Sequence, residues 1–290
     1  MASEPIDRLS GLLERFKVRA RLFNNGPLCG ISPFPAVPGR GFLHVMRSGR
    51  MELRHGARSG LPRQLVISEP TLLFYPRPVT HEFRNPPVDG SDYVCAELDF
   101  EGGECNPLVR ALPPLIVLPL SEVDGLEQAL GLLFRETERL RCGQRLLADR
   151  LFEIVLIQLL RWLLDHPAEA GIPRGLLTGL GDARLSRALV AMHEQPGAPW
   201  SLASLAAEAG MSRSAFAVAF KAVVGQPPAD YLADWRVSLA QGRLRQGLAV
   251  KQIADELGYA NASALSRLFA QRLGHSPRQW LEADAVAAQA

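Results

Sequence analysis

The period of apolar and polar positions changes along the chain, and this change predicts its layout. Residues 5–22 carry apolar and charged positions at helical spacing, which predicts a short amphipathic helix. From Phe23 to about Leu120, short apolar segments are separated by Gly and Pro, a pattern typical of an antiparallel sandwich or barrel. The segments expected to be strands are 42–46, 51–53, 65–67, 71–75, 93–100 and 115–118.

Two longer helical patterns follow, over residues 123–141 and 145–165. In the second, the polar positions form one narrow stripe of Arg150, Glu153, Arg161 and Asp165, and nearly every other position is apolar. A helix that is apolar over most of its circumference must be covered on several sides. We expect a second subunit to cover one of them, giving a homodimer; the alternative is a helix buried wholly within its own chain.

The carboxyl-terminal part contains an internal repeat. The six residues from Leu205 and the six from Ile253 both read aliphatic-Ala-x-Glu-x-Gly, and each copy closes with Gly-x-x-Pro-x-x-aromatic-Leu, starting at Gly225 and at Gly274. Chance rarely repeats Gly, Pro and aromatic positions together. The alternative, two unrelated helical hairpins in a bundle, gives no reason for this repetition.

Each copy has the local chemistry of a helix-turn-helix. Gly210 and Gly258 stand where the first helix must stop, because Gly tolerates the left-handed conformation at that position. Ser212 and Asn261 then follow as N-caps of the next helix. The repeat therefore predicts two helix-turn-helix units in series.

Composition narrows the classes of protein. The chain has 290 residues, 47% of them hydrophobic and 21% charged, which suits about two globular domains. Residues 183–285 hold 11 Lys and Arg against 8 Asp and Glu, a net charge of +3, and the rest of the chain has a net charge of −1. This weak basic bias is compatible with a nucleic-acid-binding end. With no apolar leader over residues 1–16 and no membrane span, we expect a cytoplasmic protein whose cysteines are mostly reduced.

The repeat resembles the AraC/XylS family of bacterial transcription regulators. The resemblance is carried by Ile253-Ala254, Gly258-Tyr259, Ser266-Arg267-Leu268-Phe269, Gly274 and Pro277. The amino-terminal part looks like the cupin-type sensor domain of many such regulators, on residues 28–30, on 72–76 followed by His81, and on 151–162. Together the resemblances imply an α+β multidomain fold, in which a β-rich cupin-like barrel plus helices precedes an all-α domain of two helix-turn-helix units.

The resemblance also assigns domains and partners. Expected are a cupin-like sensor domain over residues 1–122, a helical dimerisation region over 123–168, a linker over 169–182 and a DNA-binding domain over 183–285. The family implies a transcription factor, here expected to be an activator, that places two recognition helices in successive major grooves of double-stranded DNA. RNA polymerase, a small-molecule effector and a second copy of the chain are the other expected partners, and no cofactor is expected.

The candidate DNA-binding residues lie on the outward faces of the second helix of each unit and at its caps. They are Ser212, Arg213, Ser214, Ala217, Val218, Lys221, Arg236, Asn261, Ser263, Ser266 and Arg267. Arg267 is the best candidate for reading a base, because guanidinium can bond guanine bidentately. Lys221, Lys251 and Arg236 are expected to contact phosphates, the alternative being solvated surface charge. The small apolar Ala217 and Val218 depart from the family's longer polar residues and could touch thymine methyl groups.

Enzyme chemistry finds little support in the sequence. His44, His55, His81 and Glu52 are the candidate metal ligands, but they lack the spacing of a cupin ligand set, and a metal needs at least three convergent ligands. No motif supports a nucleophile with its base. We therefore expect neither a metal site nor catalytic residues; a cupin metalloenzyme with an accessory helical domain is the alternative from another class.

Two cysteines are candidate redox sensors. Some regulators with this sensor type respond to oxidants through cysteines at positions that look like Cys29 and Cys95. An entry segment pairing beside the strand 93–100 could bring the two thiols within bonding range. The alternatives are an inert buried Cys95 with a loop thiol at Cys29, and a barrel that senses an organic molecule.

Overall fold

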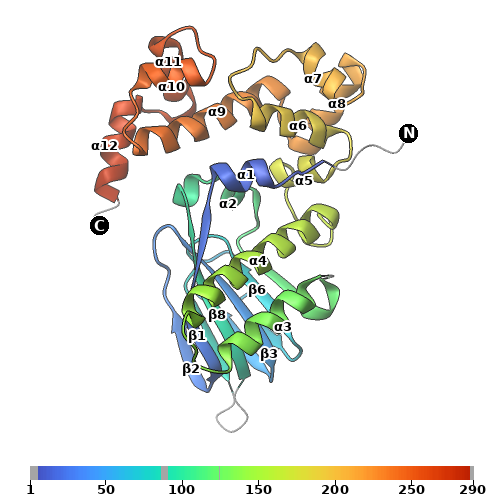
Figure 1. The fold of residues 1–290 in the computed structure, drawn as a ribbon, viewed down its shortest axis with the longest axis vertical. Helices are drawn as coiled ribbons and strands as arrows, with labels where there is room; N and C mark the ends of the chain where they lie inside the picture. Colours follow the sequence, from blue (N-terminus) through green and yellow to red (C-terminus); the bar gives the residue numbers. More distant parts are fainter. Residues whose placement is uncertain (1–5, 86–90, 124, 288–290) are drawn as a thin grey trace. The chain divides into compact units, whose positions relative to one another are not determined.

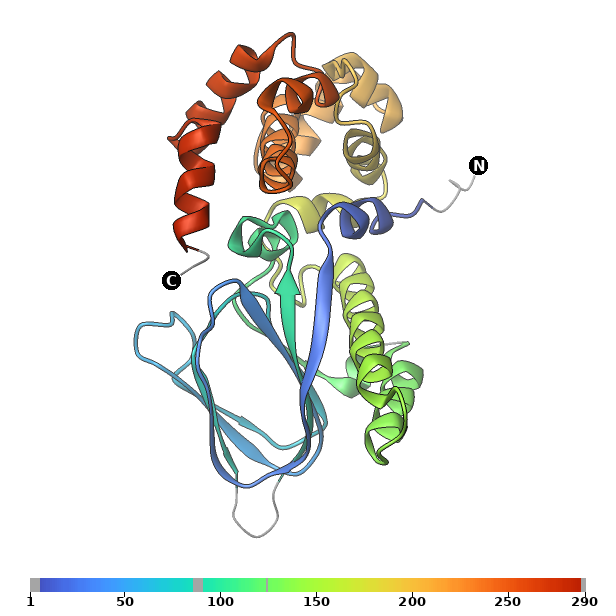
Figure 2. The ribbon, with the colours of Figure 1, turned by 60° about the vertical axis from the view of Figure 1, so that its left-hand side comes forward.

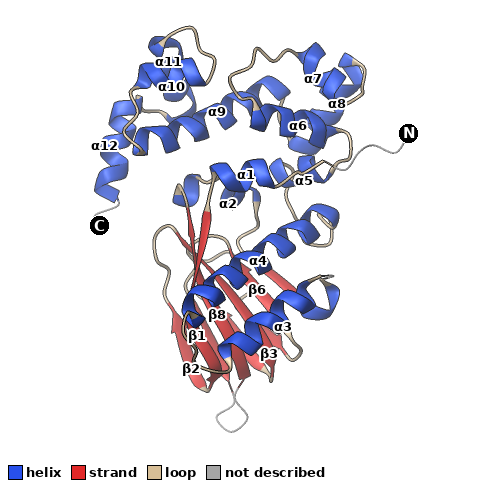
Figure 3. Ribbon diagram, viewed as in Figure 1, coloured by secondary structure: helices blue, strands red, loops and turns tan. Residues whose placement is uncertain are grey.

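The structure is a computed structural model that describes residues 6–85, 91–123 and 125–287 (Figure 1). Within these residues the chain forms two compact units. The β unit consists of the described parts of Lys17–Glu104 and Val109–Pro173, and the helical unit of those of Met1–Phe16, Cys105–Leu108 and Arg174–Ala290. The strands lie in the β unit and most of the helices in the other (Figure 3). This confirms the expected fold class.

The β unit contains two antiparallel sheets. Their strands are β1 (Val18–Leu28), β2 (Gly30–Phe34), β3 (Arg40–Ser48), β4 (Met51–His55), β5 (Gln64–Ile67), β6 (Thr71–Tyr75), β7 (His81–Asn85), β8 (Ser91–Phe100) and β9 (Ile116–Pro119). One sheet has the order β1-β8-β3-β6-β9 and the other β2-β7-β4-β5. Figure 2 shows the strands enclosing an interior. Because side chains alternate between the faces of a strand, every second residue enters this interior.

The structure corrects the predicted helix over residues 5–22. Only α1 (Ser10–Arg15) is helical, and β1 begins at Val18. Val18, Ala20 and Leu22 are also spaced two apart, which suits a strand, and β1 pairs with β8 from Val18↔Phe100 to Leu28↔Ser91. Pairing with a strand some seventy residues away outweighs the local helical spacing. The strands β2 and β7 were likewise absent from the sequence prediction.

Two helices, α3 (Leu126–Thr137) and α4 (Gln144–Asp165), pack together outside the barrel beside β1 (Figure 2). Carboxylates of α4 serve the outer strand of the sheet: Asp149 accepts a hydrogen bond from the Leu22 N–H at 2.7 Å, and Glu153 accepts one from Ala20 at 3.4 Å. Backbone donors of β1, at the end of the sheet order, thereby gain partners.

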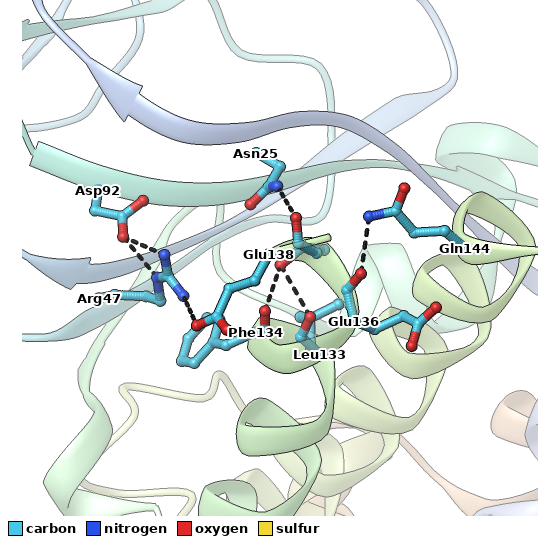
Figure 4. A network of polar contacts seen from close by, with 9 residues as sticks. Asn25, Arg47, Asp92, Leu133, Phe134, Glu136, Glu138 and Gln144 are labelled. Carbon is cyan, nitrogen blue, oxygen red and sulfur yellow. Dashed lines mark hydrogen bonds and ion pairs between the residues drawn. The ribbon is translucent and has the colours of Figure 1, made fainter. Parts of the chain in front are cut away.

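A polar network fixes the end of α3 to the sheet (Figure 4). Arg47 on β3 lies between Asp92 on β8 and Glu138, which follows α3, and its guanidinium is 4.9 Å from the ring of Phe134. Asn25 on β1 donates to the carbonyl of the last residue of α3. These contacts hold the helix pair to both β1 and β8.

Most of the apolar side chains of α4 are buried. Leu156 and Leu160 are 2% and 0% exposed, so they do not lie on a free surface. Leu147 and Ile154, seven residues apart on one face, are 47% and 44% exposed. The alternative of a helix buried in its own chain therefore describes most of α4, and a dimer contact through α4 would use its exposed positions, Leu146, Leu147 and Ile154.

The helical unit contains α1, α5 (Leu176–Gly181), α6 (Leu185–Glu194), α7 (Leu202–Glu208), α8 (Arg213–Val224), α9 (Pro228–Arg245), α10 (Val250–Glu256), α11 (Ala262–Leu273) and α12 (Pro277–Ala287). The short helix α2 (Pro107–Ala111) lies between β8 and β9 in the chain. None of the described helices has the length and apolar content that crossing a membrane requires.

Two boundaries of the helical unit differ from the sequence prediction. The expected linker over 169–182 includes α5, whose Leu177 and Leu180 are fully buried. At the other end, α1 packs on α6, with Leu12 1% exposed and Phe16 edge-on to Trp235 at 5.2 Å. Residues expected in the sensor domain thus complete the core of the helical unit.

Candidate nucleic-acid interface

The two turns form as their residues predict. Gly210 and Gly258 have positive φ angles of 62° and 75°, which glycine adopts without strain. Ser212 accepts a hydrogen bond from Ala215 N–H at 3.3 Å, and Asn261 accepts one from Ala264 N–H at 2.9 Å. Both caps are confirmed, so these side chains already have a structural role at the start of α8 and α11.

The helices α8 and α11 each bury one face and expose the other. The aromatic residues Phe216, Phe220 and Phe269 are fully buried, as expected. The outward face of α8 carries Arg213, Ser214, Ala217, Val218 and Lys221, and that of α11 carries Ser263, Ser266 and Arg267. Ala217 and Ser266 are half-buried and the others exposed. The structure therefore places these eight predicted residues on two helix faces, one in each helix-turn-helix.

Several cations elsewhere in the helical unit are bound to carboxylates. Arg243, Arg245 and Arg272 form ion pairs with Glu256, Asp284 and Asp230. Within the described residues, Arg213, Lys221 and Arg267 form no ion pair with a carboxylate. Their charge is left for a partner that carries negative charge, as the DNA backbone does. Val218, which is 72% exposed, is an apolar group on the outward face of α8.

The side chain of Arg236 has an arrangement that the sequence did not predict. Its guanidinium donates to the carbonyls of Pro196 and Ala198, at 2.6 and 3.1 Å, and lies 5.2 Å from the ring centre of Tyr259. The side chain is half-buried and bound within the protein. This position favours a structural role over the expected phosphate contact. Lys251, by contrast, is exposed.

The barrel interior holds three buried histidines among aromatic rings. His81 Nδ1 lies 2.8 Å from the Val79 carbonyl and must donate to it, so its Nε2 accepts from His44 Nε2 at 3.0 Å. His44 Nδ1 is then an unprotonated acceptor, and it is buried without a hydrogen-bond partner among the described residues. Burial lowers the pKa of His81 to about 4 and that of His44 well below its usual value, the latter helped by neighbouring His81.

The third histidine is also bound within the protein. His55 donates from Nδ1 to the Pro62 carbonyl at 2.6 Å and accepts from the Tyr75 hydroxyl at 2.9 Å. Glu52, half-buried on β4, is paired with Arg54. Each candidate metal ligand is therefore bonded to another group of the protein. The described parts of the chain contain no group of three His, Cys, Asp or Glu side chains placed to hold a metal.

The two cysteines do not meet in this structure. Cys95 is fully buried on β8, opposite Asn24 of β1, whereas exposed Cys29 lies just beyond the last pair, Leu28↔Ser91. Five residues of extended chain span roughly 16 Å, and a disulfide requires Cα atoms within about 7 Å. The expectation that the thiols lie within bonding range is wrong for this conformation. Burial also raises the pKa of Cys95, which disfavours the reactive thiolate.

Comparison with known proteins agrees with the two units. A family model described as Cupin matches residues 7–165, and one described as a helix-turn-helix domain matches residues 205–283. The chain belongs to the family that the Cupin model describes, and it carries a helix-turn-helix domain as well.

Two relatives and one solved structure illustrate the match. An AraC-like transcription regulator of Streptomyces lividans is 37% identical over 173 residues, which cover 59% of this chain and 56% of that protein. The HTH-type transcriptional regulator AlkR of Acinetobacter baylyi is 35% identical over 192 residues, 64% of this chain and 61% of that protein. The DNA-binding domain of AdpA, solved in complex with a target DNA, is 29% identical over 35% of this chain and 93% of that domain, with a TM-score of 0.33.

The match to these curated relatives therefore covers little more than half of their length.

The sequence prediction missed the pairing of His44 with His81 and the contacts of Arg236. The available signal for β7 was the alternation of the charged Glu82 and Arg84 with His81, Phe83 and Asn85, which the structure shows to be buried. The contacts of Arg236 join segments forty residues apart and have no local signal.

Proposed function

We propose that this chain is a transcription regulator that binds double-stranded DNA through the exposed faces of α8 and α11. The observation that carries the proposal is the repeated arrangement of an N-capped helix with an outward face whose cations have no carboxylate partner within the described residues. Helix-turn-helix units read the major groove with such a helix. The relatives' names, which describe transcription regulators, also support it.

Individual side chains have distinct roles in this proposal. Arg267 reads a base, because its fork matches the acceptors of guanine. Val218 contacts a thymine methyl group, which would explain an exposed valine on this face. Arg213 and Lys221 contact phosphates, so they contribute affinity with little sequence preference.

The cupin domain is proposed to receive the regulatory signal. Its interior is mostly apolar and aromatic, and the acceptor His44 Nδ1 lacks a protein partner among the described residues. A small apolar molecule with one hydrogen-bond donor would satisfy that atom. Oxidation at Cys29 or Cys95 is the second proposed signal. Cys29 is exposed, whereas oxidation of Cys95 requires β8 to open because that thiol is fully buried.

Assembly and mode of action complete the proposal. Leu147 and Ile154 on α4, together with Leu132 on α3, are exposed leucine and isoleucine side chains that a second copy of the chain would cover. The homodimer would act in the cytoplasm as an activator, next to RNA polymerase.

A genome-wide footprint of the full-length protein tests the proposal. The expected result is protection of a limited set of promoter regions that share one sequence. The competing cupin metalloenzyme makes the opposite prediction, namely stoichiometric metal on the purified protein and no retention of genomic DNA. That pair of results would reverse the assignment.

A further inference from the structure

The helix α9 joins two similar halves of the helical unit. The first half comprises α6, α7 and α8, and the second comprises α10, α11 and α12 (Figure 1). Because α8 and α11 each have their own turn, caps and buried face, neither needs the other half for its local structure. The orientation of one half relative to the other therefore depends on the contacts made around α9.

One side chain of α9 reaches both halves. Arg236 donates to the carbonyls of Pro196 and Ala198, which lie between α6 and α7 in the first half. The same guanidinium stacks on Tyr259, which lies between α10 and α11 in the second half. An arginine fork held by two carbonyls and an aromatic face has little freedom to move. Arg236 thus ties both halves to the helix between them.

The backbones of the two halves also meet beside this arginine. A Cβ atom placed on Gly258 would overlap the carbonyl oxygen of Gly197, and one placed on Gly197 would overlap the carbonyl oxygen of Glu256. Gly210, which corresponds to Gly258 in the first copy of the repeat, has nothing within 4 Å of such a Cβ. Close backbone contact is therefore specific to the junction of the halves and is not required by the turn itself.

The repeat shows that these residues are not needed by a helix-turn-helix as such. Counting from the closing glycines Gly225 and Gly274, the position of Arg236 is occupied by Ala285 in the second copy. Counting from the turn glycines, Tyr259 corresponds to Met211 in the first copy. The arginine and the tyrosine occur only where one half meets the other.

We infer that Arg236, Tyr259 and the Gly197–Gly258 contact form a joint that fixes the spacing of the two DNA half-sites. Arg236 is a positioning residue in this inference, which rests on the proposed DNA binding. One added base pair displaces the second half-site by about 3.4 Å and turns it by about one tenth of a helical turn. A fixed joint cannot follow this change, so one recognition helix loses its base contacts.

The test uses DNA duplexes that wild-type, full-length protein selects from a random library, and the same duplexes with one base pair added or removed between the half-sites. Affinity is measured by fluorescence anisotropy. Wild-type protein is expected to lose about tenfold or more in affinity on either change, the cost of roughly one lost base contact. In Arg236→Ala and in Gly197→Ala, the ratio between native and altered spacing should fall by at least about threefold, because the joint loosens.

Arg245→Ala is the matched control. Arg245 also lies on α9, is 4.9 Å from the ring of Trp280 and pairs with Asp284, both in the second half; it also interacts with Cys105, which belongs to neither half. Its removal takes away the same charge and a similar stacking contact, and should leave the spacing ratio unchanged. Arg236→Lys keeps the charge but not the fork, so it should behave like Arg236→Ala.

The outcomes are distinguishable. If Arg236 contacts a phosphate instead, Arg236→Ala will weaken every spacing equally and reduce the salt dependence, and Arg236→Lys will restore binding, which overturns the inference. An unchanged spacing ratio in both Arg236→Ala and Gly197→Ala overturns it as well. Thermal melting confirms that each variant is folded. Failure of the wild-type protein to select any DNA would refute the proposed function itself.

Discussion

Replacing Leu12 with Ala should destabilise the helical unit, although residue 12 precedes the whole barrel in the chain. The side chain is 1% exposed, and α1 packs on α6. Arg8 and Arg15 add hydrogen bonds to the carbonyls of Leu180 and Glu194, at 3.2 and 2.9 Å. Truncating a buried leucine to alanine costs about 2–5 kcal/mol. Because α1 has only six residues and can relax, we expect about 2–3 kcal/mol.

Hydrogen exchange of backbone amides, measured for individual peptides, shows which of the two units loses stability. In Leu12→Ala, amides of α6 and α9 should exchange faster, and those of β3 and β8 should not change. The half-buried neighbour Leu13 is the matched control, and Leu13→Ala should cost about 1 kcal/mol or less. Faster exchange in the barrel strands, with α6 unchanged, would refute the assignment of α1 to the helical unit.

Three further predictions concern DNA binding, assembly and acid stability. Lys221→Ala should weaken binding to all DNA sequences about equally and lower the salt dependence by about one phosphate contact; a change in base preference in a selection experiment would contradict this. Ile154→Glu should give a folded monomer by light scattering, whereas Leu156→Glu, at a buried position, should unfold the β unit; a folded Ile154→Glu dimer would exclude this face. Burial lowers the pKa of His81 from 6.5 to about 4. Below pH 6.5 the unfolded chain therefore binds a proton at His81 that the folded chain does not, so the contribution of His81 to the free energy of unfolding should fall by roughly 1.4 kcal/mol per pH unit towards pH 4. Buried His44 and His193, whose pKa values are also lowered, add to this fall. Urea unfolding at pH 7 and pH 5 measures the difference, and equal stability at the two pH values would contradict it.

The helix-turn-helix units could be predicted because their determinants are local. A glycine at positive φ, a capping side chain and a buried stripe all lie within about twenty residues, and the chain contains each of them twice. Because the same pattern of residues occurs twice, Gly210 and Gly258 could be distinguished from glycines in other turns. The same local reasoning placed Phe216 and Phe269 in the core and Arg267 outside it.

The barrel was predicted less completely because its determinants are distant in sequence. Residues 18–22 suit either a helix or a strand, and pairing with β8 decides between them. The register of β1 against β8 also separates Cys29 from Cys95, and no residue near either cysteine in the sequence determines that register. The pattern of α4 showed that the helix is covered, but only the folded unit shows that Leu156 faces inward and Ile154 outward.

Selection from random double-stranded DNA by the wild-type protein and by Arg267→Ala tests the central claim most directly. The wild-type protein should enrich one sequence with two half-sites about one helical turn apart. Arg267→Ala should lose preference at one base pair, at a cost of about 1–3 kcal/mol, and keep it at the others. Recovery of no enriched sequence, or of an identical sequence with Arg267→Ala, would contradict the account.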